Sequence, residues 1–241
     1  MLEIEDLWVD VEEKEVLKGV KLQIPQGETH ILFGKNGSGK STLLMTIMGF
    51  ARYRVKQGRI AFSGRDITHL PVYERARLGL GLAFQRPPVI RGVTMRDLLR
   101  ECSAAGISSE QFVQQYNFSE FLDRDVNYGF SGGELKRSEL LQLLVQDPLL
   151  VLLDEPESGV DLESLQLVGE IIGRLLQKEC RCEKRQKSGF IISHTGFILD
   201  YIHADRGYVL SDGQIRCFGH PLELLSDIKN MGYEECIQCQ R

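Results

Sequence analysis

The 241-residue sequence predicts an α/β fold with a largely parallel sheet, and three observations support this prediction. Strand-like and helix-like patterns alternate along most of the chain, which is the order that builds parallel sheets. Residues 149–153 form a continuous apolar run, as expected of a strand that is covered on both faces. A glycine-rich loop at 34–41 lies between a predicted strand and a predicted helix.

The elements can be assigned in chain order. Residues 2–11 alternate apolar and polar side chains and therefore predict a half-buried strand, and 15–24 predict a second strand. The turn at 25–27 leads into a third strand at 30–33, before the loop. The later elements are an apolar helix at 40–50, short strands at 60–62 and 80–84, a mainly helical stretch at 94–145, a buried strand at 149–153, a helix with an apolar stripe from 165 to 175, a buried strand at 189–193 and a hairpin at 206–219.

Composition and charge exclude several classes of protein. The net charge of −5 argues against a nucleic-acid surface, which is usually basic. No apolar run approaches 18 residues, so no membrane span or direct membrane insertion is expected, and the acidic N-terminus is not a signal peptide. The default location is cytoplasmic. The pairs Cys180/Cys182 and Cys236/Cys239 lack common zinc spacing, which leaves reduced thiols or a metal or redox role open.

A phosphate-binding loop is the clearest functional pattern. Residues 34–41 read GKNGSGKS and fit G-x-x-x-x-G-K-[ST]. Glycines let the backbone amides approach phosphate oxygens, and the following helix adds the positive end of its dipole. Lys40 would hold the β- and γ-phosphates of a nucleotide, and the Ser41 hydroxyl would ligate Mg²⁺.

A second pattern places two carboxylates at the end of a buried strand, in the segment LLVLLDE at 149–155. Charges at such a position usually serve a cation or a reaction, because burying them is costly. Asp154 is expected to support Mg²⁺, directly or through water. Glu155 is the candidate general base, a role worth about 10²–10⁴-fold in rate. Together with the loop, these carboxylates predict ATP hydrolysis.

The segment SGGE at 131–134 has two interpretations. Ser131 and Glu134 have the spacing of a capping box, which covers the free amides at a helix start. Gly132 and Gly133 are unfavourable in a helix, where each costs up to about 1 kcal/mol relative to alanine. Paired glycines at a helix start would instead suit the close approach of an anion.

In this order, the patterns resemble the ABC ATPase cassette over nearly the whole chain. The resemblance implies a single domain at 1–241, with a P-loop core, a mostly parallel sheet, an N-terminal antiparallel β subdomain and a helical subdomain inserted at about 88–145. Cassettes of this family close head to tail around ATP. Lys40 and Ser131 of one chain would therefore serve different nucleotides.

The resemblance also implies roles for single residues. Gln85 matches the family's Q-loop, Asp161 ends the D-loop segment SGVD, and His194 matches the switch histidine that contacts the γ-phosphate. Glu155, His194 and Gln85 are the expected catalytic residues. Mg²⁺ would be held by Ser41, Gln85 and Asp154. The expected ATP-binding residues are Gly34, Lys35, Asn36, Gly37, Ser38, Gly39, Lys40, Ser41, Thr42, Ser131, Gly132, Gly133, Glu134 and Asp161.

Finer details are most similar to SufC, the soluble ATPase of iron–sulfur cluster assembly. NYGFSGGELKR at 127–137 is close to that family's N-x-G-F-S-G-G-E-x-K-R, and FQRPP at 84–88 is also similar. The expected function is ATP-driven homodimerisation that reshapes a SufB/SufD-like scaffold. Pro156 matches transporter cassettes instead, so the main alternative is the peripheral ATPase of an ABC membrane transporter. An ATP-gated metal-binding regulator is a third.

Two departures from the family pattern carry predictions of their own. Val11 stands where cassettes commonly stack an aromatic ring on adenine, and the nearest aromatic residue is Trp8, which predicts weak and unselective purine binding. Glu134 replaces the common glutamine and would repel a phosphate unless it folds back as a cap or pairs with Lys136 or Arg137. We expect Glu134 and Lys136 to keep hydrolysis low until a scaffold binds.

Overall fold

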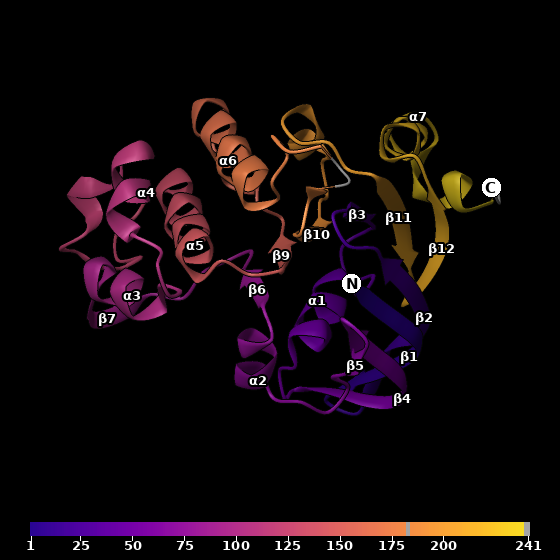
Figure 1. Ribbon diagram of the computed structural model, residues 1–241. Helices are drawn as coiled ribbons and strands as arrows, with labels where there is room; N and C mark the ends of the chain where they lie inside the picture. Colours follow the sequence, from indigo (N-terminus) through magenta and orange to yellow (C-terminus); the bar gives the residue numbers. More distant parts are fainter. Residues whose placement is uncertain (182–183, 239–241) are drawn as a thin grey trace.

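The computed structural model describes residues 1–181 and 184–238, with side chains described up to Glu234. Its strands form a six-stranded sheet, a four-stranded sheet and a two-stranded ribbon (Figure 1). The strands are β1 (Leu2–Val11), β2 (Lys14–Ile24), β3 (Thr29–Phe33), β4 (Tyr53–Phe62), β5 (Arg65–Asp66), β6 (Leu80–Ala83), β7 (Ile90–Thr94), β8 (Asp125–Val126), β9 (Leu150–Asp154), β10 (Ser188–Ile192), β11 (Arg206–Ser211) and β12 (Gln214–Gly219). The helices are α1 (Lys40–Met48), α2 (Val72–Arg77), α3 (Met95–Cys102), α4 (Ser109–Gln115), α5 (Gly132–Gln146), α6 (Leu162–Leu175) and α7 (Pro221–Gln238), with 3₁₀ turns η1 (Ser119–Phe121) and η3 (Phe197–Asp200).

The six-stranded sheet confirms the predicted fold class. Its order is β12-β11-β3-β10-β9-β6, and all neighbours are parallel except β12, which pairs with β11 as the predicted hairpin. The four-stranded sheet, β2-β1-β4-β5, is antiparallel. In the register of the larger sheet, Ile192 pairs with Leu32 and Asp154, and Leu153 pairs with Ala83. The segments that follow β3, β6, β9 and β10 therefore emerge at one edge.

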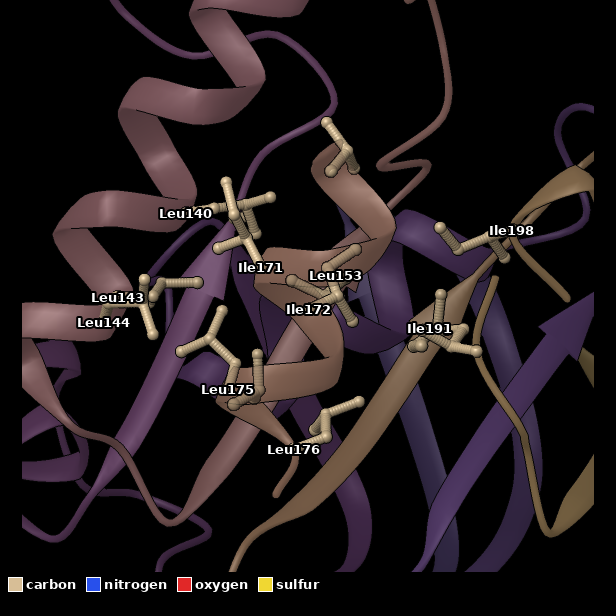
Figure 2. Close-up of a cluster of buried hydrophobic side chains, with 14 of the residues drawn as sticks. Leu140, Leu143, Leu144, Leu153, Ile171, Ile172, Leu175, Leu176, Ile191 and Ile198 are labelled. Atoms are coloured by element: carbon tan, nitrogen blue, oxygen red, sulfur yellow. The ribbon is translucent and has the colours of Figure 1, made fainter. Parts of the chain in front are cut away.

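The central strands are buried on both faces, as the apolar run at 149–153 predicts. Leu152 and Phe190 belong to a core that includes α1 and the four-stranded sheet. Leu153 and Ile191 point the other way, into a core with α5 and α6 (Figure 2). Neighbouring residues of one strand thus serve opposite cores, because successive side chains alternate across a sheet.

The stretch expected to be mainly helical contains a short β-ribbon as well. β7 pairs antiparallel with β8, and α3, α4 and α5 complete the region, which lies away from the four-stranded sheet in Figure 1. Whether residues 88–145 form an inserted subdomain stays a prediction. The strand expected at 60–62 is also longer in the structure, since β4 pairs with β1 as far as Val11 opposite Tyr53.

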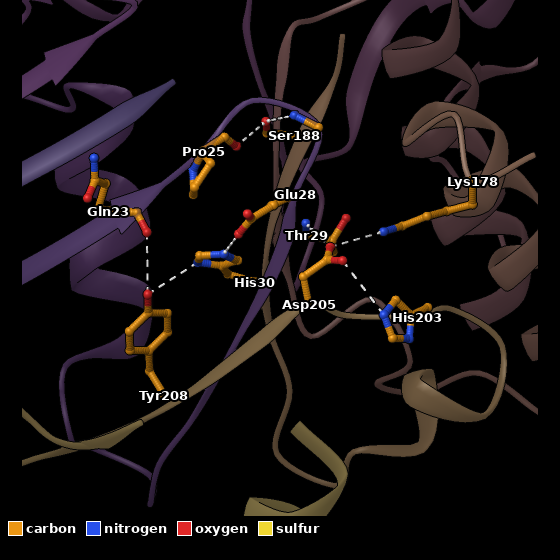
Figure 3. Close-up of polar contacts among 11 residues, drawn as sticks. Gln23, Pro25, Glu28, Thr29, His30, Lys178, Ser188, His203, Asp205 and Tyr208 are labelled. Carbon is orange, nitrogen blue, oxygen red and sulfur yellow. Dashed lines mark hydrogen bonds and ion pairs between the residues drawn. The ribbon is translucent and has the colours of Figure 1, made fainter. Parts of the chain in front are cut away.

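Polar side chains at the amino-terminal edge of the large sheet are hydrogen-bonded to one another and to nearby backbone (Figure 3). Glu28 Oε2 lies 2.7 Å from His30 Nε2, and the Tyr208 hydroxyl lies 3.3 Å from His30 Nδ1. Burial lowers the pKa of His30, although Glu28 opposes the shift. Asp205 accepts a hydrogen bond from the Thr29 amide at 2.7 Å. These contacts join the starts of β3 and β11 and are structural.

Candidate active site

The phosphate-binding loop connects β3 to α1 at the carboxyl edge of the large sheet. Gly37 and Gly39 have φ values of +79° and +106°, which favour glycine because a Cβ is strained there. A Cβ on Gly34 would lie 2.5 Å from the carbonyl oxygen of Leu210. The sequence thus forms a tight loop in front of the α1 N-terminus, which is a favourable place for an anion.

Lys40, the first residue of α1, folds its side chain back over the loop. Its Nζ donates to the carbonyl oxygens of Gly34 at 2.8 Å and Lys35 at 3.1 Å. Burial lowers the pKa of Lys40, and the nearby carboxylates of Glu155 and Asp154 oppose that shift. The loop therefore holds a buried cation that faces two acids across the site.

The far end of α1 is held by a buried arginine that the sequence did not single out. Arg75 Nη1 donates to the carbonyl oxygens of Thr46 and Ile47 at 2.9 and 2.8 Å. Its other nitrogens donate to Leu70 and Thr68. Burial lowers the pKa of Arg75 to about 10. Placed at the negative end of the helix dipole, this cation fixes the helix that carries the loop.

Asp154 ends β9 beside the loop and is almost fully buried. Burial raises the pKa of its carboxyl group, while a hydrogen bond with Ser41 and the charge of Lys40 oppose the rise. Its Oδ1 has no hydrogen-bond partner within the described residues. An unpartnered carboxylate oxygen next to a hydroxyl fits a hard divalent cation, which prefers oxygen ligands.

Glu155 is placed by an unusual backbone conformation. Its φ is +48°, which is uncommon for a residue with a side chain, and its amide donates to the Ile192 carbonyl oxygen at 3.0 Å. Gln85 Nε2 donates to Glu155 Oε2 at 2.6 Å, so the structure brings the ends of β6 and β9 together. His194 is exposed and follows β10, two residues beyond the partner of Asp154.

The signature segment begins α5 with the expected capping box. Ser131 Oγ accepts from the Glu134 amide at 3.4 Å, and Glu134 Oε2 accepts from the Ser131 amide at 2.8 Å. Glu134 therefore folds back on the helix start as a cap, which is one of the two arrangements expected from the sequence. Lys136 does not pair with Glu134, because its ammonium group is buried against other backbone.

Close packing within one chain explains the paired glycines. A Cβ on Gly132 would lie 1.9 Å from the carbonyl oxygen of Gly159, and one on Gly133 would lie 2.6 Å from Ser164 Oγ. Gly159 and Asp161 belong to the predicted D-loop, and Asp161 caps α6 by accepting from the Ser164 amide at 2.9 Å. The helix start and the D-loop therefore form one packed unit.

Sequence reasoning missed the buried ion pair on α5. Lys136 Nζ and Glu139 Oε2 are 3.9 Å apart, and both side chains are almost fully buried. Burial lowers the pKa of Lys136 and raises the pKa of Glu139 to about 7. Charged residues three apart on an otherwise apolar helix face were the signal that could have found the pair.

A third buried carboxylate lies next to His194. Glu157 Oε1 accepts from the hydroxyl groups of Ser193 and Thr195, the residues on either side of the histidine. Ser193 Oγ in turn accepts from the Gly196 amide at 2.8 Å. Burial raises the pKa of Glu157, with its hydrogen bonds opposing the shift. The backbone around His194 is thus anchored to the segment after β9.

Val11, which stands where cassettes commonly stack an aromatic ring on adenine, is the last residue of β1. Val11 is half-buried between Lys14 and Tyr53 in the register of its sheet. Trp8 Nε1 donates to Asp6 Oδ1 at 3.1 Å, so its indole is bonded to a side chain of its own strand. Weak and unselective purine binding stays a prediction.

The cysteine pairs are only partly visible. Cys180 carries a free thiol, whereas the thiols of Cys182, Cys236 and Cys239 lie outside the described residues. Within the described part of the chain, no group of three or more His, Cys, Asp or Glu side chains could hold a metal ion. Helices in that part are also too short or too polar to cross a membrane.

Solved structures with this fold include ATP-binding cassettes. A nucleotide-free cassette from an ABC transporter superposes with a TM-score of 0.79 at 24% identity, covering 98% of both chains. A cassette of an ABC transporter in its ADP conformation gives 0.76 at 26% identity, over 95% of this chain and 96% of the other.

Sequence comparisons identify the family. The family model described as ABC transporter matches residues 17–158. Vegetative protein 296 of Bacillus subtilis is 39% identical over 97% of this chain and 92% of its own length. The probable ATP-dependent transporter ycf16 of Pyropia yezoensis is 38% identical over 97% and 96%. This chain therefore belongs to the ABC transporter family and is an ATPase of the ABC type.

Proposed function

We propose that the chain binds ATP with its phosphate loop and hydrolyses it to change the conformation of a soluble SufB/SufD-like scaffold in iron–sulfur cluster assembly. The observation that carries the proposal is the signature segment at 127–137, whose distinguishing residues build a polar connection to the loop at 84–88. The work would be done in the cytoplasm.

ATP binding follows from the loop geometry. Gly39 precedes α1 and offers no side chain to cap it, so the first amides of the helix are open to an anion, and Lys40 would supply the charge for the β- and γ-phosphates. Lys40 would exchange its two carbonyl contacts for phosphate oxygens. Because those carbonyls belong to the loop itself, the exchange requires little rearrangement.

Mg²⁺ fits the oxygen donors beside this loop. Ser41, Asp154 and Gln85 would hold the ion, and the open Oδ1 of Asp154 supplies a ligand or accepts from an ion-bound water. When bound, the ion would neutralise charge that develops on the phosphates. The same raised pKa that burial gives Asp154 would fall when the cation arrives.

Hydrolysis would use Glu155 as the general base. Gln85 holds one oxygen of Glu155 at 2.6 Å, which leaves the other oxygen for the attacking water. His194 stands beyond the adjacent strand and would contact the γ-phosphate. The left-handed backbone at Glu155 comes directly after the last residue of β9, and the Glu155 carboxylate lies within hydrogen-bond distance of Gln85.

Completion of the site by a second copy is part of the proposal. Ser131 is exposed, and the hydrogen bonds of the Ser131–Glu134 cap join these two residues to each other rather than to the phosphate loop. Ser131, Gly132 and Gly133 of one chain, with Asp161, would cover ATP held on the loop of its partner. A transient homodimer then forms only with ATP bound.

The signature residues that resemble SufC tie α5 to the loop after β6, beside an exposed surface that either partner could use. Asn127 Nδ2 donates to the Pro88 carbonyl oxygen at 2.8 Å, and Ser138 Oγ donates to Asn127 Oδ1 at 2.7 Å. This buried network fastens α5 to the loop after β6. Exposed Val89 and Tyr128 lie on that same part of the chain, where an apolar surface marks a partner site.

The second candidate is the peripheral ATPase of an ABC membrane transporter. The names of the relatives favour it, because several are described as ABC transporter ATP-binding proteins or ATP-dependent transporters. Pro156 after Glu155 agrees with it too. Both candidates use the same ATPase site, so only the partner separates them.

Affinity purification of the tagged chain from its native lysate, with and without detergent, tests the choice. Recovery of a soluble scaffold without detergent supports iron–sulfur cluster assembly. Recovery of a multi-span permease that appears only with detergent overturns it in favour of the transporter. The Val89→Asp variant serves as a control for surface docking, since either partner should be lost with it.

A further inference from the structure

A buried ion pair on α5 holds the backbone of the loop that carries Gln85. Lys136 Nζ donates to the carbonyl oxygens of Phe84 at 2.7 Å and Gln85 at 3.0 Å. Glu139 Oε1 accepts from the Phe84 amide at 2.8 Å. Lys136 is 3% exposed and Glu139 is 6% exposed. Both backbone groups of Phe84 are therefore bound by side chains from one helix turn.

The loop needs these partners because it has left the sheet. β6 ends at Ala83 on the edge of the six-stranded sheet, so Phe84 and Gln85 have no neighbouring strand on which to bond. Unpaired backbone groups in a buried setting are costly. Burying an ammonium group and a carboxylate also costs desolvation free energy, which apolar side chains at the same positions of α5 would avoid. A specific use of the pair would account for its presence.

We propose that Lys136 and Glu139 are positioning residues for hydrolysis: they fix the Phe84–Gln85 backbone so that Gln85 Nε2 stays on Glu155. The proposal rests on the roles proposed above for Gln85 and Glu155. In this way α5, which begins with the signature segment, helps to position the catalytic carboxylate of its own chain. The hydrogen bonds and the ion pair of these two residues go to Phe84, to Gln85 and to each other rather than to the loop at 34–41.

A double-mutant cycle with Gln85 tests the proposal. Lys136→Met should lower kcat about tenfold and leave KM for ATP within about twofold, because a displaced catalytic group costs rate rather than ground-state binding. Gln85→Ala should lower kcat as well. The double variant should be no slower than Gln85→Ala alone, since Lys136 acts through Gln85. Full additivity of the two effects would overturn the proposal.

Arg137→Met is the matched control on the next residue. Its guanidinium also donates to two backbone carbonyl oxygens, but these belong to Tyr116 and Asn117 and not to the loop that carries Gln85. It should leave kcat within about twofold. An equal loss of kcat in this variant would mean that α5 is merely destabilised, and would reject the positioning role.

Amide hydrogen exchange of the nucleotide-free chain gives a readout that does not depend on turnover. The Phe84 amide should exchange about tenfold faster in Glu139→Ala, because it donates to Glu139 Oε1, whereas Glu139→Gln keeps an acceptor and should retain protection. Unchanged exchange in Glu139→Ala contradicts the proposal even if the scaffold function holds. Faster exchange supports it even if the partner is a permease.

Discussion

The phosphate loop and the signature segment are both glycine-rich helix starts, yet they are built differently. The loop at 34–41 lies at the edge of a buried sheet, with Lys40, Asp154 and Glu155 converging on it. The signature start, Ser131–Glu134, covers its own amides with a capping box and packs on the D-loop. The amides at the start of α1 have no side-chain cap and are open to an anion, whereas those at the start of α5 are already hydrogen-bonded by a capping box.

Two glycines at a helix start therefore do not by themselves define an anion site. The loop leaves an uncapped N-terminus, since Gly39 offers no side chain to cover it. The signature start can serve phosphate only if a ligand displaces the contacts of Ser131 and Glu134, which costs about 0.5–2 kcal/mol for such a cap. ATP held by another chain would supply that displacement.

Glu155→Gln should produce the largest effect on turnover, because it removes the proposed general base beside the phosphate loop. We expect kcat to fall by about 10²–10⁴-fold while ATP affinity is retained. Steady-state phosphate release and nucleotide titration measure the two quantities. Glu170→Gln, on the exposed face of α6, is the control and should behave as wild type. Unchanged turnover in Glu155→Gln would remove it from the reaction.

Gly132→Ala should distinguish the role of the signature start from that of the phosphate loop. The new methyl group would meet the Gly159 carbonyl oxygen, so the signature start and the D-loop must move apart. We expect kcat to fall about 10²-fold with the affinity of the phosphate loop for ATP unchanged. Gly173→Ala, where nothing lies within 4 Å, is the matched control and should be neutral or stabilising. A loss of ATP affinity in Gly132→Ala would show that one chain joins both regions.

The pH dependence of stability should report on Glu139, the buried carboxylate on the helix that begins with the signature segment. Its pKa in the folded chain is about 7, above the ordinary value of 4.5, so the native state holds a proton that the unfolded chain has lost. The free energy of unfolding should therefore fall as pH rises between these values, by up to about 1.4 kcal/mol per pH unit. Urea unfolding at pH 5, 6 and 7 should show a flatter dependence for Glu139→Gln. Identical slopes would contradict this.

Glu134→Gln should give the smallest effect. Glutamine also completes a capping box, so the free energy of unfolding should change by less than about 0.5 kcal/mol. Removing the negative charge should raise basal ATPase activity, because the helix start would then accept phosphate more readily. A fall in basal activity would count against a restraining role for Glu134.

The sequence predicted most of the sheet and most of the residues that gather at its carboxyl edge. Strong patterns made this possible: the apolar run ending in Asp154 and Glu155, and the glycines of the loop. It could not predict that Lys136 donates to the carbonyl oxygens of Phe84 and Gln85, because a charged residue on a helix looks the same whether it faces solvent or a backbone carbonyl. The buried Arg75 was missed for the same reason, since only tertiary packing brings it to the end of α1.

The central claim is that each chain holds two halves of different sites. It is tested most directly by the mass of Glu155→Gln in solution, measured by light scattering with Mg²⁺, with and without saturating ATP. We predict the mass of two chains with ATP and of one chain, about 27.3 kDa, without it. A single-chain mass with ATP demonstrably bound would contradict the account.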